Sequence, residues 1–417
     1  ALSGTTLYPT GSEEGFTLKK TKIRGEESNG MICAEDELGL GTAHEGIMVL
    51  EEDTPIGMPA SDYFRVKTDT VFEIGLTPNR IDGASHLGAA RDLAAYFKQA
   101  GEEVALTWPA IESFAIDHDR NHIDIDIEER SGCKRYSGLT ISGITVKASP
   151  QWLQNRLKAI GLAPINNVVD ITNYVLHEVG QPLHAFDADK IKGQKVIVKT
   201  LPEGSSFITL DEKERKLRGE DLMICNAEEG MCIAGVFGGI GSGVTEKTRN
   251  VFLESACFDP VYVRKTARHH VLNTDASFRF ERGSDPEITV WALKRAAIMI
   301  RELAGGEVSS EIVDVYPEPV LPARVPVSFD RMSRLIGKNI PAKTLRSILT
   351  SLDIEIEKED SEGMTLLIPP YRVDVTREAD VVEEILRIYG YNNVEFDHSL
   401  RSTLAFTTKK KKKKVVN

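Results

Sequence analysis

Four prolines within ten residues constrain this chain more than any other feature of its sequence: Pro317, Pro319, Pro322 and Pro326. Proline has no backbone N–H and its ring obstructs the preceding helical turn, so neither a long helix nor a central strand can run through such a segment. The chain has 417 residues, enough for several domains, and it is expected to divide there. A long N-terminal part would end near residue 317, and a small unit of roughly seventy residues would follow.

The residues from 118 to 317 carry strand and helix signals in an irregular order. Ile123, Ile125 and Ile127 alternate with polar residues, as in a half-buried strand. Further apolar runs predict strands at 195–200, 206–210, 222–226 and 231–236. The clearest helix lies between Asp285-Pro286 and Gly305-Gly306. Because helices and strands do not alternate as in βαβ units, the predicted fold class is a multidomain α+β fold.

The segments on either side are shorter. Residues 1–55 combine short β-like runs with glycines, which predicts a small β-barrel or a remnant of one. A helix capped by Ser85 is expected in the next segment. Its buried face would consist of Leu87, Ala90, Leu93, Ala94 and Phe97. The small unit should contain two helices and a β pair. The expected divisions are 1–55, 56–117, 118–317, 318–395 and 396–417, the last with a lysine-rich tail.

The charge of the chain argues mildly against a nucleic-acid partner. Its net charge is −12, and without the run Lys409–Lys414 it would carry 45 basic and 63 acidic residues, a net charge of −18. An acidic surface repels polyanions, so contact with RNA or DNA requires local basic patches. One patch consists of Lys19, Lys20, Lys22 and Arg24. It is equally typical of a nucleic-acid-binding barrel and of a solvated strand face.

Cysteine usage and hydropathy indicate the compartment. The five scattered cysteines, Cys33, Cys133, Cys225, Cys232 and Cys257, form no C-x-x-C pair. They are therefore expected to be buried apolar residues, as in a reducing cytosol. No apolar run approaches the roughly 20 residues of a membrane helix, and the first residues show no signal peptide. A cytoplasmic location without a membrane partner is expected.

Three polar motifs suggest chemistry, each with a structural alternative. The glycine-rich segment 234–243 is followed by neither a basic residue nor a long apolar helix, which excludes a P-loop or a dinucleotide oxidoreductase. His184 follows Thr172 and Asn173 by about a dozen residues and could share a polar pocket with them, or be a structural histidine. Asp374, Asp380, Glu383 and Glu384 could bind Mg²⁺, or could simply favour a helix N-terminus.

Taken together, these stretches resemble the beta-subunit family of bacterial phenylalanyl-tRNA synthetase. The matching segments, in the order and spacing of that family, are GMICAEDELGLG (30–41), TPNR (77–80), SHLG (85–88), VDITNY (169–174), GQPLHAFD (180–187), IAGV (233–236), LESA (253–256), SFRFERG (277–283) and VVEEILRIYGY (381–391). The resemblance extends from residue 1 to about residue 395 and is highly specific.

The resemblance implies that different domains and subunits have different functions. It implies the remnant of an OB-like tRNA-binding barrel at 1–55, a mixed α/β editing domain at 118–317 and a small winged-helix-like domain at 318–395. The family's catalytic-like module and anticodon-binding domain would be missing. In the family, an alpha subunit of an α₂β₂ enzyme uses ATP to join phenylalanine to its tRNA, so this chain alone is expected neither to bind ATP nor to charge tRNA. The beta subunit hydrolyses tyrosine wrongly attached to the phenylalanine tRNA.

The family's site residues map onto this chain one by one. The editing pocket corresponds to Thr172, Asn173, His184, Ala234, Gly235 and Glu254. In this pocket Glu254 would accept the tyrosine phenol, Gly235 would let the backbone approach the ligand, and the polar side chains would orient the ester and a water. A covalent nucleophile is not expected. Mg²⁺, shared with the alpha subunit, would sit on Asp374, Asp380, Glu383 and Glu384.

RNA contacts are expected from two sets of basic residues. The first is the patch Lys19, Lys20, Lys22 and Arg24, and the second comprises Arg264, Lys265, Arg268, Arg279 and Arg282. The sequence around His269 and His270 departs from the more arginine- and glycine-like stretch expected there, which puts nearby contacts in doubt. The alternative function is a non-catalytic scaffold that binds tRNA and the alpha subunit.

Overall fold

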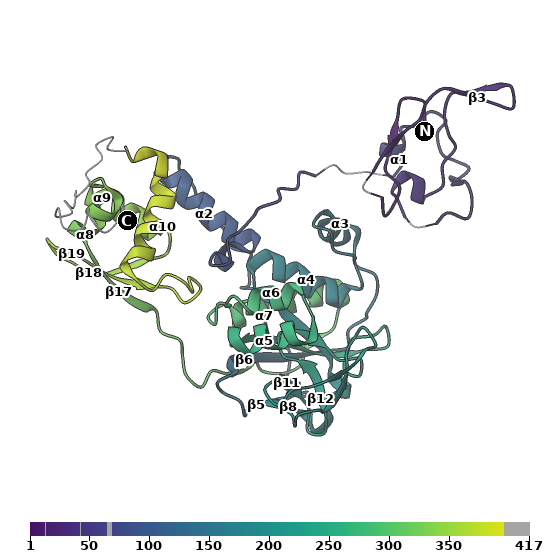
Figure 1. The fold of residues 1–417 in the computed structure, drawn as a ribbon. Coiled ribbons are helices and arrows are strands. Elements are labelled where there is room, and N and C mark those ends of the chain that lie inside the picture. The colour runs from purple at the N-terminus through teal and green to yellow at the C-terminus, as the bar shows by residue number, and fades with distance from the viewer. Residues whose placement is uncertain (13, 42, 65–68, 396–417) are drawn as a thin grey trace, which may run out of the picture. The chain divides into compact units, whose positions relative to one another are not determined.

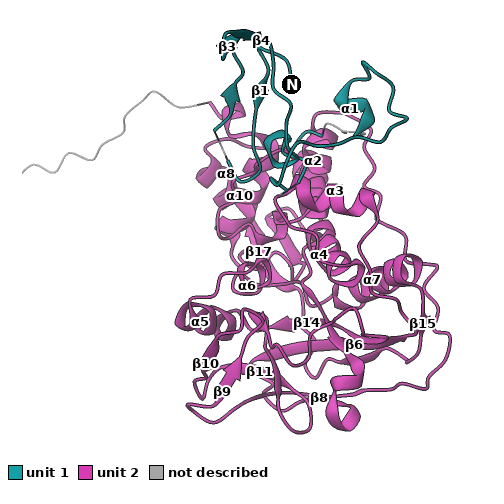
Figure 2. Cartoon of the chain, turned by 90° about the vertical axis from the view of Figure 1, so that its right-hand side faces the viewer, with its two compact units in different colours: residues 1–70 teal, residues 71–417 magenta. Residues whose placement is uncertain are grey.

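The structure is a computed structural model that describes residues 1–12, 14–41, 43–64 and 69–395. It divides into two compact units, residues 1–70 and 71–417 (Figure 2). The predicted lysine-rich tail and the rest of 396–417 lie outside the described residues.

The first unit contains two small hairpins. β1 (Thr6–Leu7) pairs with β2 (Phe16–Thr17), and β3 (Thr21–Ile23) pairs with β4 (Glu26–Ser28), each as a separate antiparallel sheet. Arg24 and Gly25, both with positive φ, form the turn between β3 and β4. One helical turn, α1 (Ala60–Tyr63), follows. The described residues of this unit close no barrel because strands of two or three residues cannot pair around one, and the OB-like barrel is therefore not confirmed.

The second unit begins with a well-capped helix. α2 (His86–Gln99) starts after Ser85, whose hydroxyl accepts a hydrogen bond from the backbone N–H of Gly88, as predicted. Leu87 is buried, but Leu93 and Phe97 are exposed, so the predicted buried face is only partly correct. Ala94 is buried, as predicted, and so is Ala95, which was not expected.

An antiparallel sheet and a mixed sheet form the body of the second unit. The first has the order β15 (Glu307–Val308), β6 (Cys133–Ser142), β14 (Asn250–Phe258), β7 (Leu183–Asp187), with β16 (Val313–Val315) also on β6. The second has the order β13 (Phe237–Gly238), β12 (Gly230–Ile233), β11 (Leu222–Cys225), β8 (Lys195–Thr200), β5 (Asp124–Ile127), and only β5 and β8 are parallel. A short hairpin joins β9 (Ser206–Ile208) and β10 (Glu214–Lys216).

Helices and the second sheet cover opposite faces of the first sheet. α4 (Asn167–Val179) and α7 (Thr289–Ala304) lie on one side of β6, and the strands β5, β8, β11 and β12 lie on the other (Figure 1). Successive side chains of β14 point to opposite faces of the first sheet. Leu253 packs with α4 and α7, whereas Phe252 packs with the second sheet. The remaining helices of this body are α3 (Gln151–Ala159), α5 (Pro260–His270) and α6 (Asp275–Phe280).

The small C-terminal part has a core of its own. Its sheet has the order β17 (Ala323–Ser328), β19 (Gly363–Ile368), β18 (Glu355–Glu359), and its helices are α8 (Phe329–Ile336), α9 (Ala342–Ser351) and α10 (Glu378–Tyr389). Pro326, expected in the linker, lies inside β17, which tolerates a proline because it is an edge strand. Within the described ranges the fold is mixed α and β, as predicted, and the winged-helix detail stays a prediction. None of the helices there has the length and apolar character of a membrane span.

Candidate functional site

Neighbouring strands place Glu254 and His184 side by side. In the register of the first sheet, Glu254 on β14 lies directly opposite His184 on β7 and opposite Gly138 on β6. Directly opposed residues of antiparallel strands project from the same face, with Cβ atoms about 5 Å apart. Glu254 and His184 therefore share the face that packs toward the second sheet, as the predicted pocket requires.

Glu254 is a buried carboxylate with one engaged oxygen. It is 5% exposed, and the phenol of Tyr136, on β6, donates a 2.7 Å hydrogen bond to its Oε2. Its Oε1 accepts no hydrogen bond from the described residues. Burial raises the pKa of Glu254 to about 7, although the Tyr136 hydrogen bond acts against this rise. Sequence reasoning missed Tyr136, which lies 118 positions from Glu254 and carries no motif.

His184 is neutral in this environment. It is half-buried, and its ring meets Phe186 edge to face at 4.4 Å between centroids. Burial lowers the pKa of His184 to about 4, so its imidazole is uncharged at pH 7. A group with this pKa is a weak base, which favours a positioning role over that of a general base.

Ala234 and Gly235 lie in the core beside this face. Ala234 is buried, and Gly235 adopts a left-handed conformation with φ +67°. A Cβ at Gly235 would lie 2.9 Å from the Phe280 ring and 3.0 Å from the Phe258 ring. Side chains of this chain therefore already require glycine at this position, and the approach of a ligand to Gly235 stays a prediction.

Thr172 and Asn173 are on α4, whose apolar residues cover the opposite face of the sheet. The Thr172 hydroxyl donates to the carbonyl of Val169 at 2.7 Å, and Asn173 makes no side-chain hydrogen bond within the described part of the chain. No hydrogen bond joins them to Glu254 or His184 among those residues. Their place in one pocket with Glu254 stays a prediction.

The raised pKa of Glu254 makes a pH-dependent contribution to stability. Below about pH 4.5 the Glu254 carboxyl is protonated in both the folded and the unfolded chain. Between about pH 4.5 and pH 7 the unfolded chain releases this proton while the folded chain still holds it, so the free energy of unfolding falls as the pH rises. Relative to Glu254→Gln, the wild-type chain should lose on the order of 3 kcal/mol across this window. Urea unfolding from pH 4 to pH 8 measures the difference, and a constant difference would contradict it. Both chains carry His184, whose lowered pKa has the opposite effect, so its contribution cancels.

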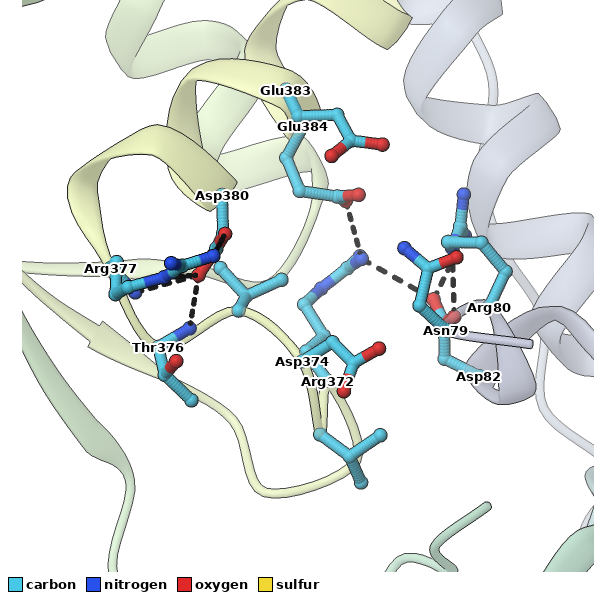
Figure 3. A pocket seen from close by; sticks show the side chains of 12 residues that line it. Asn79, Arg80, Asp82, Arg372, Asp374, Thr376, Arg377, Asp380, Glu383 and Glu384 are labelled. Atoms are coloured by element: carbon cyan, nitrogen blue, oxygen red, sulfur yellow. Dashed lines mark hydrogen bonds and ion pairs between the residues drawn. The ribbon is translucent and has the colours of Figure 1, made fainter. Parts of the chain in front are cut away.

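The four predicted metal ligands line one cavity of about 500 Å³ in the second unit. Asp374, Asp380, Glu383 and Glu384 surround it together with Arg80, Asp82, Arg372 and Arg377 (Figure 3). The four carboxylates that were grouped from the sequence therefore lie around one cavity, but the arginines beside them were not predicted.

The carboxylates do not fit a four-ligand Mg²⁺ site in this arrangement. Glu384 is buried and paired with Arg372 at 2.8 Å and with Arg387 at 2.7 Å. Asp380 accepts hydrogen bonds from the Arg377 side chain and from the backbone N–H of Thr376 and Arg377. Asp374 and Glu383 are exposed, and no group of three or more His, Cys, Asp or Glu side chains in the described residues is arranged to hold a metal. Two of the four carboxylates, Asp380 and Glu384, are therefore already paired with arginines.

A closed ring of six charged residues explains this arrangement. In order around the ring, the members are Asp82, Arg80, Asp92, Arg387, Glu384 and Arg372, each within 3.4 Å of the next. This ion-pair ring joins the start of α2 to α10 and to the loop before α10. Arg372 is its least exposed member, with a side chain that is 2% exposed. Two of the segments quoted above contain members of the ring: TPNR contains Arg80, and VVEEILRIYGY contains Glu384 and Arg387.

The pairing with arginine predicts weak magnesium binding. Calorimetric titration of this chain with MgCl₂ should show no tight, stoichiometric site, because Asp380 and Glu384 are already engaged and Mg²⁺ sheds its waters reluctantly. Asp380→Asn should leave the titration unchanged. A stoichiometric site that disappears in Asp380→Asn would contradict this prediction.

The structure separates the predicted RNA-binding residues. Lys19, Lys20, Lys22 and Arg24 are all exposed, on or beside the hairpin of the first unit. On α5, Arg264 and Arg268 are exposed without ion pairs to the described residues, and Lys265 pairs with Glu220 at 3.1 Å.

The two arginines of the SFRFERG segment have internal roles. Arg279 is 6% exposed and donates to the carbonyls of Ala84 and Asp275, so it is not available to RNA; this part of the prediction is wrong. Arg282 is half-buried, stacks on Phe278 and pairs with Glu281.

Comparisons with known proteins agree with the segments quoted above. Residues 132–305 match the B3/4 domain, and residues 325–391 match the tRNA synthetase B5 domain. The chain is 59% identical, over 98% of its length and 49% of the relative, to the phenylalanine–tRNA ligase beta subunit of Bacteroides fragilis (strain YCH46). It is 54% identical, over 98% of its length and 50% of the relative, to that of Porphyromonas gingivalis.

Among solved structures, an N-terminal fragment of the phenylalanyl-tRNA synthetase beta-subunit from Pyrococcus horikoshii aligns with 75% of this chain and 85% of that chain. The identity is 17% and the TM-score 0.36, so this likeness carries no weight for the fold. The relatives carry the identification. The chain belongs to the family of phenylalanine–tRNA ligase beta subunits and spans about half the length of the curated relatives that it matches.

Proposed function

We propose that this chain carries the editing site of a phenylalanine–tRNA ligase, which hydrolyses tyrosine wrongly attached to the phenylalanine tRNA. One observation carries the proposal: Glu254 is a buried carboxylate with a free oxygen, directly across the strand from a neutral His184. All six predicted editing residues fall inside the part that matches the B3/4 domain.

The chemistry of Glu254 suits discrimination between tyrosine and phenylalanine. An aminoacylation pocket that binds an apolar ring discriminates only about a hundredfold against a substrate that carries an added hydroxyl. A second site can invert the preference by offering a carboxylate to that hydroxyl, since a charge-assisted hydrogen bond is roughly twice as strong as a neutral one. A phenylalanyl ester would leave the free oxygen of Glu254 without a partner, at a cost of about 1–3 kcal/mol.

Hydrolysis by a positioned water fits the site better than a covalent intermediate. Within the described residues no Ser or Cys side chain hydrogen-bonds to His184, and all five cysteines are buried. Burial raises the pKa of Cys133, Cys225, Cys232 and Cys257, which disfavours a thiolate nucleophile. The neutral His184 would orient the ester or the attacking water, and Thr172 and Asn173 are proposed to assist.

An RNA partner is supported by the face of α5. Arg264 and Arg268 are exposed there, and Val263 of the same helix lies against Gly235 near the site. The basic residues would hold phosphates, so we expect binding to weaken steeply with salt. The hairpin lysines of the first unit are a second proposed contact.

The activity of the whole enzyme is part of the same proposal. An alpha subunit would join phenylalanine to tRNA with ATP and would share Mg²⁺ with this chain. In the arrangement of the carboxylate cavity, only Asp374 and Glu383 are unengaged and could offer oxygens to such an ion. We expect no ATP site on this chain and no membrane partner.

A deacylation assay tests the proposed function. The beta subunit, assembled with its alpha subunit, should hydrolyse tyrosylated phenylalanine tRNA well above the spontaneous rate and leave the phenylalanyl ester largely intact. If both esters survive at the spontaneous rate, the scaffold alternative replaces the editing proposal.

A further inference from the structure

Tyr136 is the direct hydrogen-bond partner of Glu254. Its side chain is fully buried, and its phenol donates to Oε2 of Glu254 at 2.7 Å. Tyr136 lies opposite Ala256 and Gly138 lies opposite Glu254, so the two side chains are diagonal neighbours on one face of the sheet. A Cβ at Gly138 would overlap the Phe252 ring, so the position directly opposite Glu254 takes only glycine.

The groups around Glu254 are neutral near pH 7. Among the described residues, the titratable side chains that act on it or are influenced by it are Tyr136 and Cys133 on β6, His184 on β7 and Cys232 on β12. Burial raises the pKa of Tyr136 and of both thiols and lowers that of His184, so all four are uncharged. Of these five groups, Glu254 is the one that changes its charge near neutral pH.

We infer that Tyr136 is a positioning residue for substrate specificity: its phenol holds one oxygen of Glu254 and leaves the other to accept the phenol of a tyrosyl ester. This inference rests on the proposed editing function. It assigns the two oxygens of one carboxylate to two phenols, one internal and one belonging to the substrate.

The internal phenol has two effects on the carboxylate. It fixes the side chain, so that the free Oε1 keeps one direction. It also stabilises the charged form against burial, and the charged form is the stronger acceptor. Without this hydrogen bond, Glu254 would be protonated over a wider pH range and would bind the substrate phenol less well.

Tyr136→Phe tests the inference because it removes one oxygen and keeps the ring, which packs edge to face against Phe258. In the beta subunit assembled with its alpha subunit, we expect hydrolysis of tyrosylated tRNA to fall about tenfold at pH 7. The loss should shrink toward pH 8.5, after subtraction of spontaneous hydrolysis, because Glu254 then ionises without help. Tyr262→Phe is the matched control: it removes a phenol that packs against the same core and bonds to Ser131 instead.

Two readouts separate the possible results. An unchanged rate at every pH, or an equal loss at every pH, would overturn the inference, since the second result describes a purely structural role. The pKa of the Glu254 carboxyl, followed by carbon NMR in this chain and assigned with Glu254→Gln, should rise by about one unit in Tyr136→Phe. If the wild-type enzyme does not edit, the proposed function fails, and the NMR titration alone decides whether Tyr136 controls Glu254.

Discussion

Replacing Glu254 with alanine is expected to abolish the preference for the tyrosyl ester in the assembled enzyme. The substrate phenol would lose its charged acceptor, a hydrogen bond worth about 1.5–3 kcal/mol, so hydrolysis of tyrosylated tRNA should fall by about ten- to a hundredfold. Hydrolysis of the phenylalanyl ester should change little. Single-turnover deacylation of the two esters, measured side by side, gives the ratio.

Two controls make the Glu254→Ala result interpretable. Glu254→Gln keeps the shape and the Tyr136 contact but cannot carry the charge, and it should show an intermediate loss. Charging of tRNA with phenylalanine should be preserved, because we place synthesis on the alpha subunit. Clearance of the tyrosyl ester by Glu254→Ala at the wild-type rate would show that another residue recognises the phenol.

Arg372→Ala should destabilise the C-terminal part of the chain by about 3–5 kcal/mol. Arg372 bridges Asp82 and Glu384 in the ion-pair ring, and its removal leaves three carboxylates with two arginines, Arg80 and Arg387, in a partly buried ring. Urea unfolding and amide exchange of α10 measure the effect. The control is Arg377→Ala on the same cavity: the Arg377 side chain is 78% exposed, so its ion pair with Asp380 should contribute little to stability.

The ion-pair ring also predicts that a double replacement costs less stability than a single one. Replacing Arg372 and Glu384 together by apolar residues of similar size should cost much less than Arg372→Ala, because the ring then keeps equal numbers of acidic and basic members. Equal costs for Arg372→Ala and Arg377→Ala would show that the ring contributes no more than a surface ion pair.

Local signals in the sequence correctly predicted several elements of the second unit, but not the strands β6, β7 and β14 that carry the site. β8 has the bounds expected from its apolar run, and α2 begins after the predicted cap, Ser85. α7 ends at the predicted Gly305 but begins at Thr289, a few residues after Asp285-Pro286. These elements were predictable because caps, glycine stops and apolar periodicity act over a few neighbouring residues. The barrel expected for residues 1–55 was not, because its closure depends on pairing between distant strands.

The sequence by itself determined the family, several of the elements, and His184 and Glu254 as candidate site residues. Only the tertiary structure decided their environment. It brought Tyr136 to Glu254 from 118 positions away, buried Arg279 and gave Asp380 and Glu384 arginine partners in place of a metal. Burial and charge pairing depend on which distant strands and helices become neighbours. A local pattern therefore identifies a functional side chain, but the surrounding fold decides its protonation and its partners.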